Sequence, residues 1–282
     1  MATSLDWWPS PAKLNLFLHI NARLNNGYHA LQSVFQLLDF GDKLAFEVNT
    51  SSRISMKTPI AGVKDVDNLI FRAAKALQEA SNTDLGCDIY LEKVLPMGGG
   101  IGGGSSNAAT TLVALNHLWQ CHLSIDELAD IGLSLGADVP IFVRGHSAFA
   151  EGVGEQITPL NLANKYYLVV FPGCHVSTGE IFTHPNLPRN TPKIRLQDYE
   201  FSETHNDCQK IVCERYPKVA NLLHWLLEYA PSRMTGTGAC LFSVFDTKSE
   251  AERVLSQLPE ECTGFVAQGV NRSPLYAKLD EI

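Results

Sequence analysis

Leu95-Pro96-Met97-Gly98-Gly99-Gly100-Ile101-Gly102-Gly103-Gly104-Ser105-Ser106-Asn107 is the stretch that decides the fold of this 282-residue sequence. Six of the seven residues from Gly98 to Gly104 are glycine, and glycine loses more conformational freedom on folding than any other residue. Such a run is expected where the backbone must pass through positions in which a Cβ atom would clash. The residues that follow, Ala108 to Trp119, have the composition and spacing of a helix.

A glycine loop that leads into a helix is typical of phosphate binding. The loop and the first helical turn direct several backbone N–H groups at one point, and the positive end of the helix dipole lies behind them. A flexible linker is the alternative interpretation, but flexibility alone does not require the Ser105-Ser106-Asn107 start of the helix. We therefore expect the stretch to bind the phosphates of a nucleotide.

Three widespread phosphate-binding patterns fit the stretch poorly. A P-loop needs a lysine where this chain has Gly104. A dinucleotide-binding fingerprint can be placed on Gly98, Gly100 and Gly103, but its acidic partner would then lie near Asp126, inside an expected helix and not at a strand end. The H-R-D motif of the protein-kinase catalytic loop is absent from the sequence.

Composition limits the classes of function. Hydrophobic residues make up 45% and charged residues 18% of the sequence, which is ordinary for a globular chain of two modest domains. The formal net charge of -8 excludes a nucleic acid polymer as a general partner, because wrapping a phosphate backbone needs a basic surface. A single nucleotide is still allowed, since backbone N–H groups can hold it.

Cysteine usage and hydropathy favour a cytoplasmic location. The seven cysteines are scattered and contain no C-x-x-C pair, which predicts reduced thiols and neither a disulfide framework nor a zinc site. Residues 94–125 contain no charged side chain, but the glycines and several polar residues interrupt them, so we expect no membrane span. The first 13 residues lack the basic start and apolar run of a signal peptide. No feature indicates an obligate protein partner.

The order of expected elements indicates an α+β fold in two lobes. The pattern breaks between residues 152 and 164, so we divide the chain into domains of residues 1–156 and 157–282. Strands and helices do not alternate regularly, which argues against a repeated βαβ plan. Strands are expected over Leu14–Ile20 and over residues 43–49, 87–93, 166–171, 240–245 and 264–268; helices are expected after a cap at Asp67 or Asn68, from the capping box of Ser124 and Glu127 to Leu135, over 206–229 with an interruption at Pro217, and after Thr247 with Glu250.

The pattern Pro-x-x-x-Gly-Ile-Gly-x-x-Ser-Ser at residues 96–106 resembles the ATP-binding loop of the GHMP kinases, a family of small-molecule kinases. Two more segments of the family pattern occur in the same order, Pro-Ala-Lys-Leu-Asn at residues 11–15 and Thr-Gly-Thr-Gly-Ala-Cys at residues 235–240. Segments at residues 11–18, 26–29, 136–140 and 231–236 are most similar to a member that acts on a polyol linked to cytidine diphosphate. The resemblance spans most of the chain. It implies two α+β lobes with the active site in the cleft between them.

The resemblance implies that Asp138 is the general base and that Lys13 assists it. Phosphoryl transfer needs positive charge near the developing negative charge and a destination for the proton of the attacking hydroxyl. Taken alone, Asp138 is an ordinary helix-end residue before Pro140, and Lys13 is a solvated strand end. Some related kinases act without an obvious base, so simple positioning of the hydroxyl remains an alternative.

The resemblance also implies that ATP binds as its magnesium complex around the glycine loop. The magnesium ligands stay unidentified: Ser105, Ser106 and Asn107 offer oxygens, but magnesium keeps several waters and can be held mainly by ATP. The expected nucleotide-binding residues are Pro96, Met97, Gly98, Gly99, Gly100, Ile101, Gly102, Gly103, Gly104, Ser105, Ser106 and Asn107, with Asn68 and Lys93 toward the purine.

For the second substrate, the resemblance implies that Tyr28 and Phe182 stack on a cytosine and that His29 binds its edge, since a neutral imidazole offers both a donor and an acceptor. Asn15, Phe35 and Thr178 are expected near the polyol. The implied reaction is phosphorylation of the 2-hydroxyl of the cytidyl substrate in the synthesis of isoprenoid precursors. The alternatives are another small-molecule kinase of the family and a nucleotide-binding module without catalysis.

Overall fold

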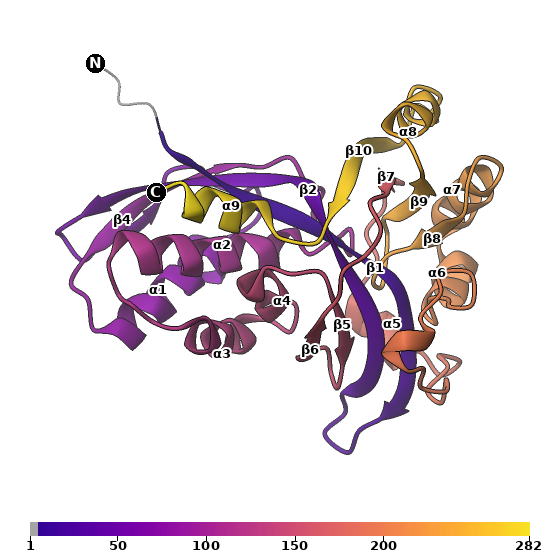
Figure 1. Ribbon diagram of the computed structural model, residues 1–282, viewed down its shortest axis with the longest axis horizontal. Coiled ribbons are helices and arrows are strands. Elements are labelled where there is room, and N and C mark those ends of the chain that lie inside the picture. Colours follow the sequence, from indigo (N-terminus) through magenta and orange to yellow (C-terminus); the bar gives the residue numbers. More distant parts are fainter. Residues whose placement is uncertain (1–4) are drawn as a thin grey trace.

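A long antiparallel hairpin runs through the centre of the protein in the computed structural model, which describes residues 5–282 (Figure 1). Its strands are β1 (Trp7–Arg23) and β2 (His29–Asn49), and their register pairs Trp7 with Ala45 and Arg23 with His29. The expected alternating strand over residues 14–20 lies inside β1. The middle of each strand is buried on both faces, so the central part of the hairpin belongs to the core, while its turn is exposed.

The remaining strands extend from this hairpin into a ten-stranded sheet. The strand order is β3-β4-β2-β10-β7-β9-β8; β1 and β5 also pair with β2, and β6 pairs with β5. Leu37 and Leu38 of β2 pair with Val270 and Gly269 of β10, which joins the earlier strands to the later ones. The bounds are β3 (Ile54–Met56), β4 (Gly86–Glu92), β5 (Ala148–Glu151), β6 (Gln156–Pro159), β7 (Tyr166–Phe171), β8 (Ser232–Met234), β9 (Leu241–Phe245) and β10 (Thr263–Val270).

The helices form two groups, one on each side of the hairpin (Figure 1). The first group is α1 (Leu69–Ser81), α2 (Gly103–Leu118), α3 (Ile125–Leu135), α4 (Val139–Arg144) and α9 (Pro274–Asp280); the second is α5 (Thr178–Thr183), α6 (Gln209–Arg215), α7 (Pro217–Leu227) and α8 (Lys248–Leu255). Short 3-10 turns span Asp65–Asp67 and Leu196–Asp198. The mixed helices and sheet confirm the α+β fold class.

Local capping signals are confirmed in detail. The Asn68 side chain accepts a hydrogen bond from the Ile70 N–H and begins α1. Both expected capping boxes form, Ser124 with Glu127 at α3 and Thr247 with Glu250 at α8. The expected interruption of the long helix is also present, because α6 ends before Pro217 and α7 begins with it.

The described part of the chain has three hydrophobic cores: two lie on opposite sides of the hairpin, and a third includes Phe17 of β1, Val34 of β2 and Phe242 of β9. The first includes Leu44 of β2, Leu112 of α2 and Phe142 of α4; the second includes Leu168 of β7 and Leu222 of α7. The C-terminal helix α9 belongs to the first core through Leu275, which is 1% exposed. An ion pair between Lys278 and Asp6, 2.7 Å apart, also joins α9 to the start of the chain.

Some elements differ from the sequence-based expectation. The strand expected from Lys43 begins at His29, because the first half of β2 is buried on both faces and shows no alternation. Helix α2 begins at Gly103 and not at Ala108, so the last two glycines of the loop are helical. Helix α9 was not expected. Within residues 5–282, no helix is long and apolar enough to cross a membrane.

Candidate active site

The glycine loop is fixed from both sides by segments that are distant in sequence. The Lys13 N–H on β1 donates to the Ile101 carbonyl at 3.0 Å, and the Cys240 N–H donates to the Gly99 carbonyl at 3.0 Å. Between these bonds, Gly100 has a φ of +74°, and a Cβ atom there would lie 2.6 Å from the Thr235 carbonyl oxygen. The expected clash is therefore real at this position, since neither the conformation nor the space admits a side chain.

Gly103 and Gly104 begin helix α2 and have a different environment. A Cβ atom on either would meet its nearest neighbours, on Leu95 and Leu69, at 3.5 Å, which is ordinary contact. Packing within the described chain thus does not require glycine at these two positions. Their N–H groups lie in the first helical turn, where no intrahelical acceptor exists, and both residues line a cavity of about 340 Å³.

Most of the expected nucleotide-binding residues line this smaller cavity. It is bordered by residues 96–105, by Asn107, and by Asn68 and Lys93. Ser106 is fully buried; Ser10 Oγ donates to Asn107 Oδ1 at 2.6 Å and lies within hydrogen-bond distance, 3.0 Å, of Ser106 Oγ. The Ser106 side chain therefore faces the interior, and the side-chain oxygen of Asn107 already accepts a hydrogen bond from the protein.

Lys93 is held by a buried carboxylate. Its Nζ lies 2.9 Å from Asp42 Oδ2, and the Asp42 side chain has no exposure. Asp42 Oδ1 also accepts from the N–H groups of Val94 and Leu95, at 2.8 Å each. This network fixes the backbone just before the glycine loop, so it shapes one wall of the smaller cavity.

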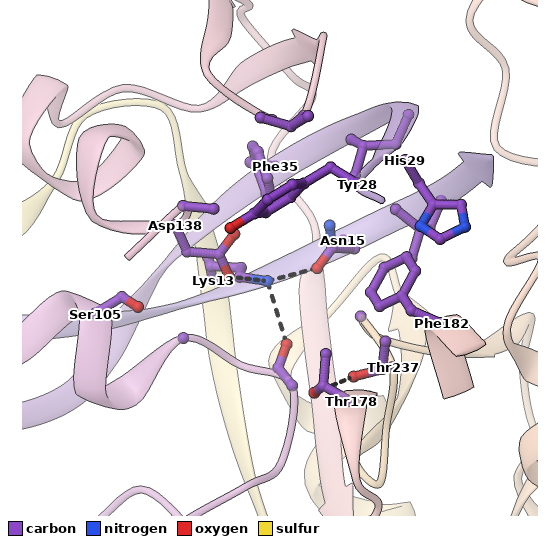
Figure 2. A pocket seen from close by; sticks show the side chains of 18 of the residues that line it. Lys13, Asn15, Tyr28, His29, Phe35, Ser105, Asp138, Thr178, Phe182 and Thr237 are labelled. Carbon is purple, nitrogen blue, oxygen red and sulfur yellow. Dashed lines mark hydrogen bonds and ion pairs between the residues drawn. The ribbon is translucent and has the colours of Figure 1, made fainter. Parts of the chain in front are cut away.

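Lys13 and Asp138 meet beside the loop, although 125 positions separate them. Lys13 Nζ lies 3.2 Å from Asp138 Oδ2, and the side chains are 3% and 38% exposed, respectively. The ammonium also donates to Asn15 Oδ1 at 2.5 Å and to the Gly100 carbonyl at 3.3 Å (Figure 2). The result is a buried cation beneath a carboxylate that is open to a cavity, where an ion pair is less screened than at the surface.

That carboxylate opens into a larger cavity of about 510 Å³. The two cavities share Gly100, Gly102 and Ser105 as lining residues, so they adjoin at the glycine loop. Lys13 and Asp138 line the larger cavity at this junction. All six residues expected to contact the second substrate also line it: Asn15, Tyr28, His29, Phe35, Thr178 and Phe182.

The polar residues of this set are already partly engaged. The Asn15 amide donates to Ser33 Oγ at 2.8 Å while its oxygen accepts from Lys13. Thr178 Oγ1 lies 2.9 Å from Thr237 Oγ1. The Phe35 ring lies under the cation, with its centroid 5.2 Å from Lys13 Nζ. Asn15 and Phe35 thus orient the ammonium as well as lining the cavity.

His29 and Phe182 form an aromatic wall at the end of the larger cavity away from Asp138, and the Tyr28 ring extends from the hairpin turn toward Asp138 (Figure 2). The rings of His29 and Phe182 stack with centroids 5.3 Å apart, while Tyr28, in the hairpin turn, is 64% exposed. Arg189 donates its Nε–H to His29 Nε2 at 3.0 Å. Burial, together with the nearby charges of Arg189 and Arg23, lowers the pKa of His29 from its ordinary value.

Sequence reasoning missed Arg189. The residue lies 160 positions from His29 in a loop rich in proline and asparagine, and no motif distinguishes it from a solvated arginine. It also changes the expectation for His29: one of the two ring nitrogens is already occupied by the protein, so a ligand meets only the other.

The site has no ready-made metal cage. Within residues 5–282, no group of three or more histidine, cysteine, aspartate or glutamate side chains is placed to hold a metal ion. Near the loop, the Ser105 hydroxyl and the Asp138 carboxylate border the junction of the cavities. Such a sparse oxygen set fits magnesium that is bound mostly by nucleotide phosphates and water.

Comparison with known proteins gives two family matches, two similar relatives and a similar solved structure. Residues 68–146 match the family described as GHMP kinases N terminal domain, and residues 194–264 match GHMP kinases C terminal. The 4-diphosphocytidyl-2-C-methyl-D-erythritol kinase of Pseudoalteromonas atlantica is 66% identical over 279 residues, or 99% of this chain and 98% of that protein. The Shewanella loihica protein of the same name is 58% identical over 275 residues and 97% of each chain. A crystal structure of 4-(cytidine 5'-diphospho)-2C-methyl-D-erythritol kinase has a TM-score of 0.83 at 29% identity, covering 94% of this chain and all of that one.

A more distant structure shares the fold alone. The mevalonate kinase of Methanococcus jannaschii has a TM-score of 0.68 at 15% identity and covers 96% of this chain and 100% of its own.

Proposed function

Because the chain belongs to the GHMP kinase family, we propose that it transfers the γ-phosphoryl group of ATP to the 2-hydroxyl of 4-diphosphocytidyl-2-C-methyl-D-erythritol, in the non-mevalonate route to isoprenoid precursors. The observation that carries the proposal is the Lys13–Asp138 pair at the junction of two cavities that share the glycine loop. The names of relatives that match over nearly the whole chain support the choice of substrate.

ATP occupies the smaller cavity, with its phosphates at the start of helix α2. The first-turn N–H groups and the helix dipole favour the negative charge there. Asn68 and Lys93 border the same cavity on the side proposed for the purine. Magnesium bound with ATP would neutralise phosphate charge, and Ser105, which lines both cavities, is the residue whose hydroxyl would help to hold it.

The acceptor substrate occupies the larger cavity, with its polyol toward Lys13 and its cytosine toward the aromatic wall. Tyr28 and Phe182 stack on the base, and each stacked ring contributes about 1–3 kcal/mol. Phe35, Asn15 and Thr178 border the polyol.

Asp138 accepts the proton of the attacking 2-hydroxyl. The new bond joins that oxygen to the γ-phosphorus, the bond from the γ-phosphorus to the bridging oxygen breaks, and ADP leaves. Lys13 orients the Asp138 carboxylate at the junction through their 3.2 Å contact and attracts the negative charge that develops on the transferring group. Its burial and three oxygen neighbours hold it in place for this role.

The decisive experiment is release of ADP with the cytidyl substrate, compared with mevalonate and homoserine, with and without magnesium. The Asp138→Asn variant should lower kcat by about 10²–10⁴, the usual range for a lost general base, while the KM for ATP stays nearly unchanged. Near-normal turnover would remove the base role and leave positioning as the function of the residue. Nucleotide binding without ADP release on any acceptor would contradict catalysis itself.

We extend the proposal to organisation and location. The chain divides into domains of residues 1–156 and 157–282, with helix α9 of the second segment returning to pack in the core of the first; it acts in the cytoplasm without an obligate protein partner and recognises no nucleic acid polymer. The seven cysteines, all free in the described structure, suit a reducing compartment.

A further inference from the structure

The hydrogen bond from Arg189 to His29 determines which ring nitrogen of His29 carries the proton. A guanidinium has five N–H donors and no acceptor, so His29 Nε2, 3.0 Å from Arg189 Nε, must accept. The proton of the neutral ring then lies on Nδ1. Within the described part of the chain, Nδ1 of His29 has no hydrogen-bond partner, while the residue lines the larger cavity.

The Arg189 guanidinium is itself held by hydrogen bonds to the backbone, so it holds the His29 ring in a fixed position. Its other N–H groups donate to the carbonyls of Leu187 at 3.1 Å, Phe182 at 3.0 Å and His184 at 2.8 Å. The same guanidinium therefore holds the backbone of Phe182, whose ring stacks on His29. Without Arg189, the His29 ring can adopt either neutral tautomer, and the backbone at Phe182 loses a hydrogen-bond donor. The experiment must separate these two effects.

We propose that Arg189 is a positioning residue that holds His29 as a fixed Nδ1–H donor and thereby makes the site prefer cytosine to uracil. The proposal rests on the function proposed above. N3 of cytosine is a hydrogen-bond acceptor, whereas N3 of uracil carries a proton. A fixed donor facing N3 therefore pairs with cytosine and opposes uracil, while an imidazole free to exchange tautomers accommodates either base.

The first test reads the imidazole directly in the full-length protein and needs no activity. Nitrogen-15 NMR of the histidine side chains, with His29→Gln to assign the signal, should show the Nδ1–H tautomer. In Arg189→Met, both tautomers should appear and the pKa of His29 should rise toward its ordinary value, because a nearby positive charge has been removed; burial and Arg23 still lower it. An unchanged tautomer in Arg189→Met would overturn the proposal.

The second test measures kcat/KM for the cytidyl substrate and for its uridine analogue. Wild type should prefer the cytidyl substrate, and Arg189→Met should reduce the ratio of the two values by roughly tenfold to a hundredfold, the range for an unpaired buried donor or acceptor. A loop that merely loosens weakens both substrates equally, so a constant ratio would contradict the specificity role. Arg195→Met, in the same loop region but paired with Asp198 on the surface, is the matched control and should keep the wild-type ratio.

His29→Gln gives an independent arm that leaves Arg189 in place. If the side-chain oxygen of the glutamine accepts from Arg189, its NH₂ group points toward the base as a donor. The His29→Gln variant should therefore still prefer cytosine. The double variant with Arg189→Met should lose the preference. Loss of preference in His29→Gln alone would count against the proposal. If wild type phosphorylates neither substrate, the proposed function fails, while the NMR result still decides the tautomer.

Discussion

A glycine can occupy the loop because a Cβ atom would clash with the protein or because it would clash with the bound nucleotide. The Gly104→Ala substitution separates these two reasons. Gly104 is the second residue of α2, and an added Cβ atom meets only Leu69 Cδ1, at the ordinary distance of 3.5 Å. Alanine in a helix is more favourable than glycine by about 0.5–1 kcal/mol. For a chain of this size, we therefore expect the melting temperature to rise by about 1–3 °C.

The same methyl group should weaken nucleotide binding. Leu69 and Gly104 both line the smaller cavity, so the new carbon stands where the phosphates approach the helix. Overpacking of this kind costs about 1–3 kcal/mol, which corresponds to a rise of about 5- to 150-fold in the Kd for ATP.

Thermal melting without nucleotide and calorimetric titration with ATP measure the two effects separately. Gly100→Ala is the control with the opposite stability change, because its φ of +74° and the Thr235 carbonyl at 2.6 Å admit no Cβ. The reasoning is refuted if Gly104→Ala lowers the melting temperature, or if it leaves the affinity for ATP unchanged.

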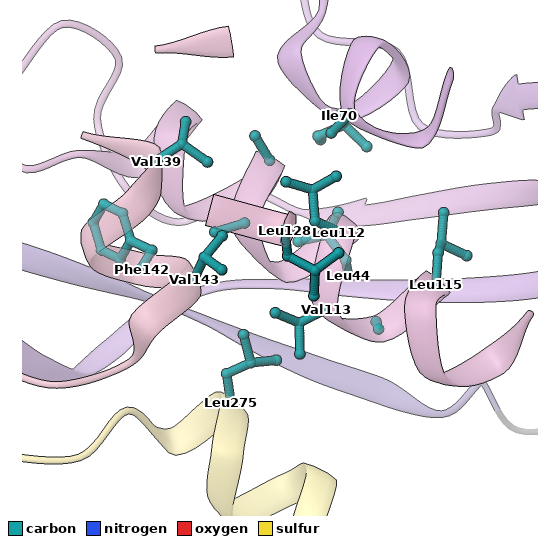
Figure 3. Packing of buried hydrophobic residues seen from close by; sticks show 14 of the residues in the cluster. Leu44, Ile70, Leu112, Val113, Leu115, Leu128, Val139, Phe142, Val143 and Leu275 are labelled. Carbon is teal, nitrogen blue, oxygen red and sulfur yellow. The ribbon is translucent and has the colours of Figure 1, made fainter. Parts of the chain in front are cut away.

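Three further predictions concern the acceptor site, the first core and the pH dependence of stability. Tyr28→Ala should raise the KM for the cytidyl substrate by roughly tenfold, the loss of one stacked ring, and spare that for ATP; equal changes in the two KM values would contradict the assignment. Leu275→Ala should lower the free energy of unfolding by about 2–5 kcal/mol, measured by urea titration, because Leu275 fills the first core from α9 (Figure 3); a loss under 1 kcal/mol would mean that α9 merely rests on the surface. Burial first, and then His205, lowers the pKa of His19 from 6.5 to about 4, so the unfolded chain binds the proton more tightly and stability falls as the pH drops through this range. Between pH 7 and pH 5 the loss should be about 2 kcal/mol, and urea titrations should show a smaller loss in His19→Gln; identical losses in the two proteins would exclude His19.

The predictable parts of the fold are those that depend on residues close together in the sequence. A capping box joins residues three positions apart, so Ser124 with Glu127 and Thr247 with Glu250 could be identified without tertiary information. The glycine run predicted a loop under steric constraint, which Gly100 confirms. The first half of β2 was not predictable from alternation, because both of its faces are buried and period-2 patterning requires one solvated face.

The candidate site also has residues that the sequence predicted and partner residues that only the structure reveals. The resemblance supplied Lys13 and Asp138, and the structure brings them within 3.2 Å; their catalytic roles stay predictions. The partners of these and other site residues depend on contacts across the fold, such as Asp42 with Lys93 and Arg189 with His29. Nothing in the neighbouring sequence distinguishes such partners from surface charges, so only the folded structure reveals them.

The position of α9 has a consequence for biosynthesis. The ribosome makes Trp7 and the glycine loop well before Leu275, which packs into the core behind them from more than 160 residues further along the chain. The half that carries the loop therefore remains open on one side until Leu275 has been made, a wait of many seconds at about 5–20 residues per second. A chain that stops before Leu275 would accordingly be damaged in the half of the enzyme that was translated first.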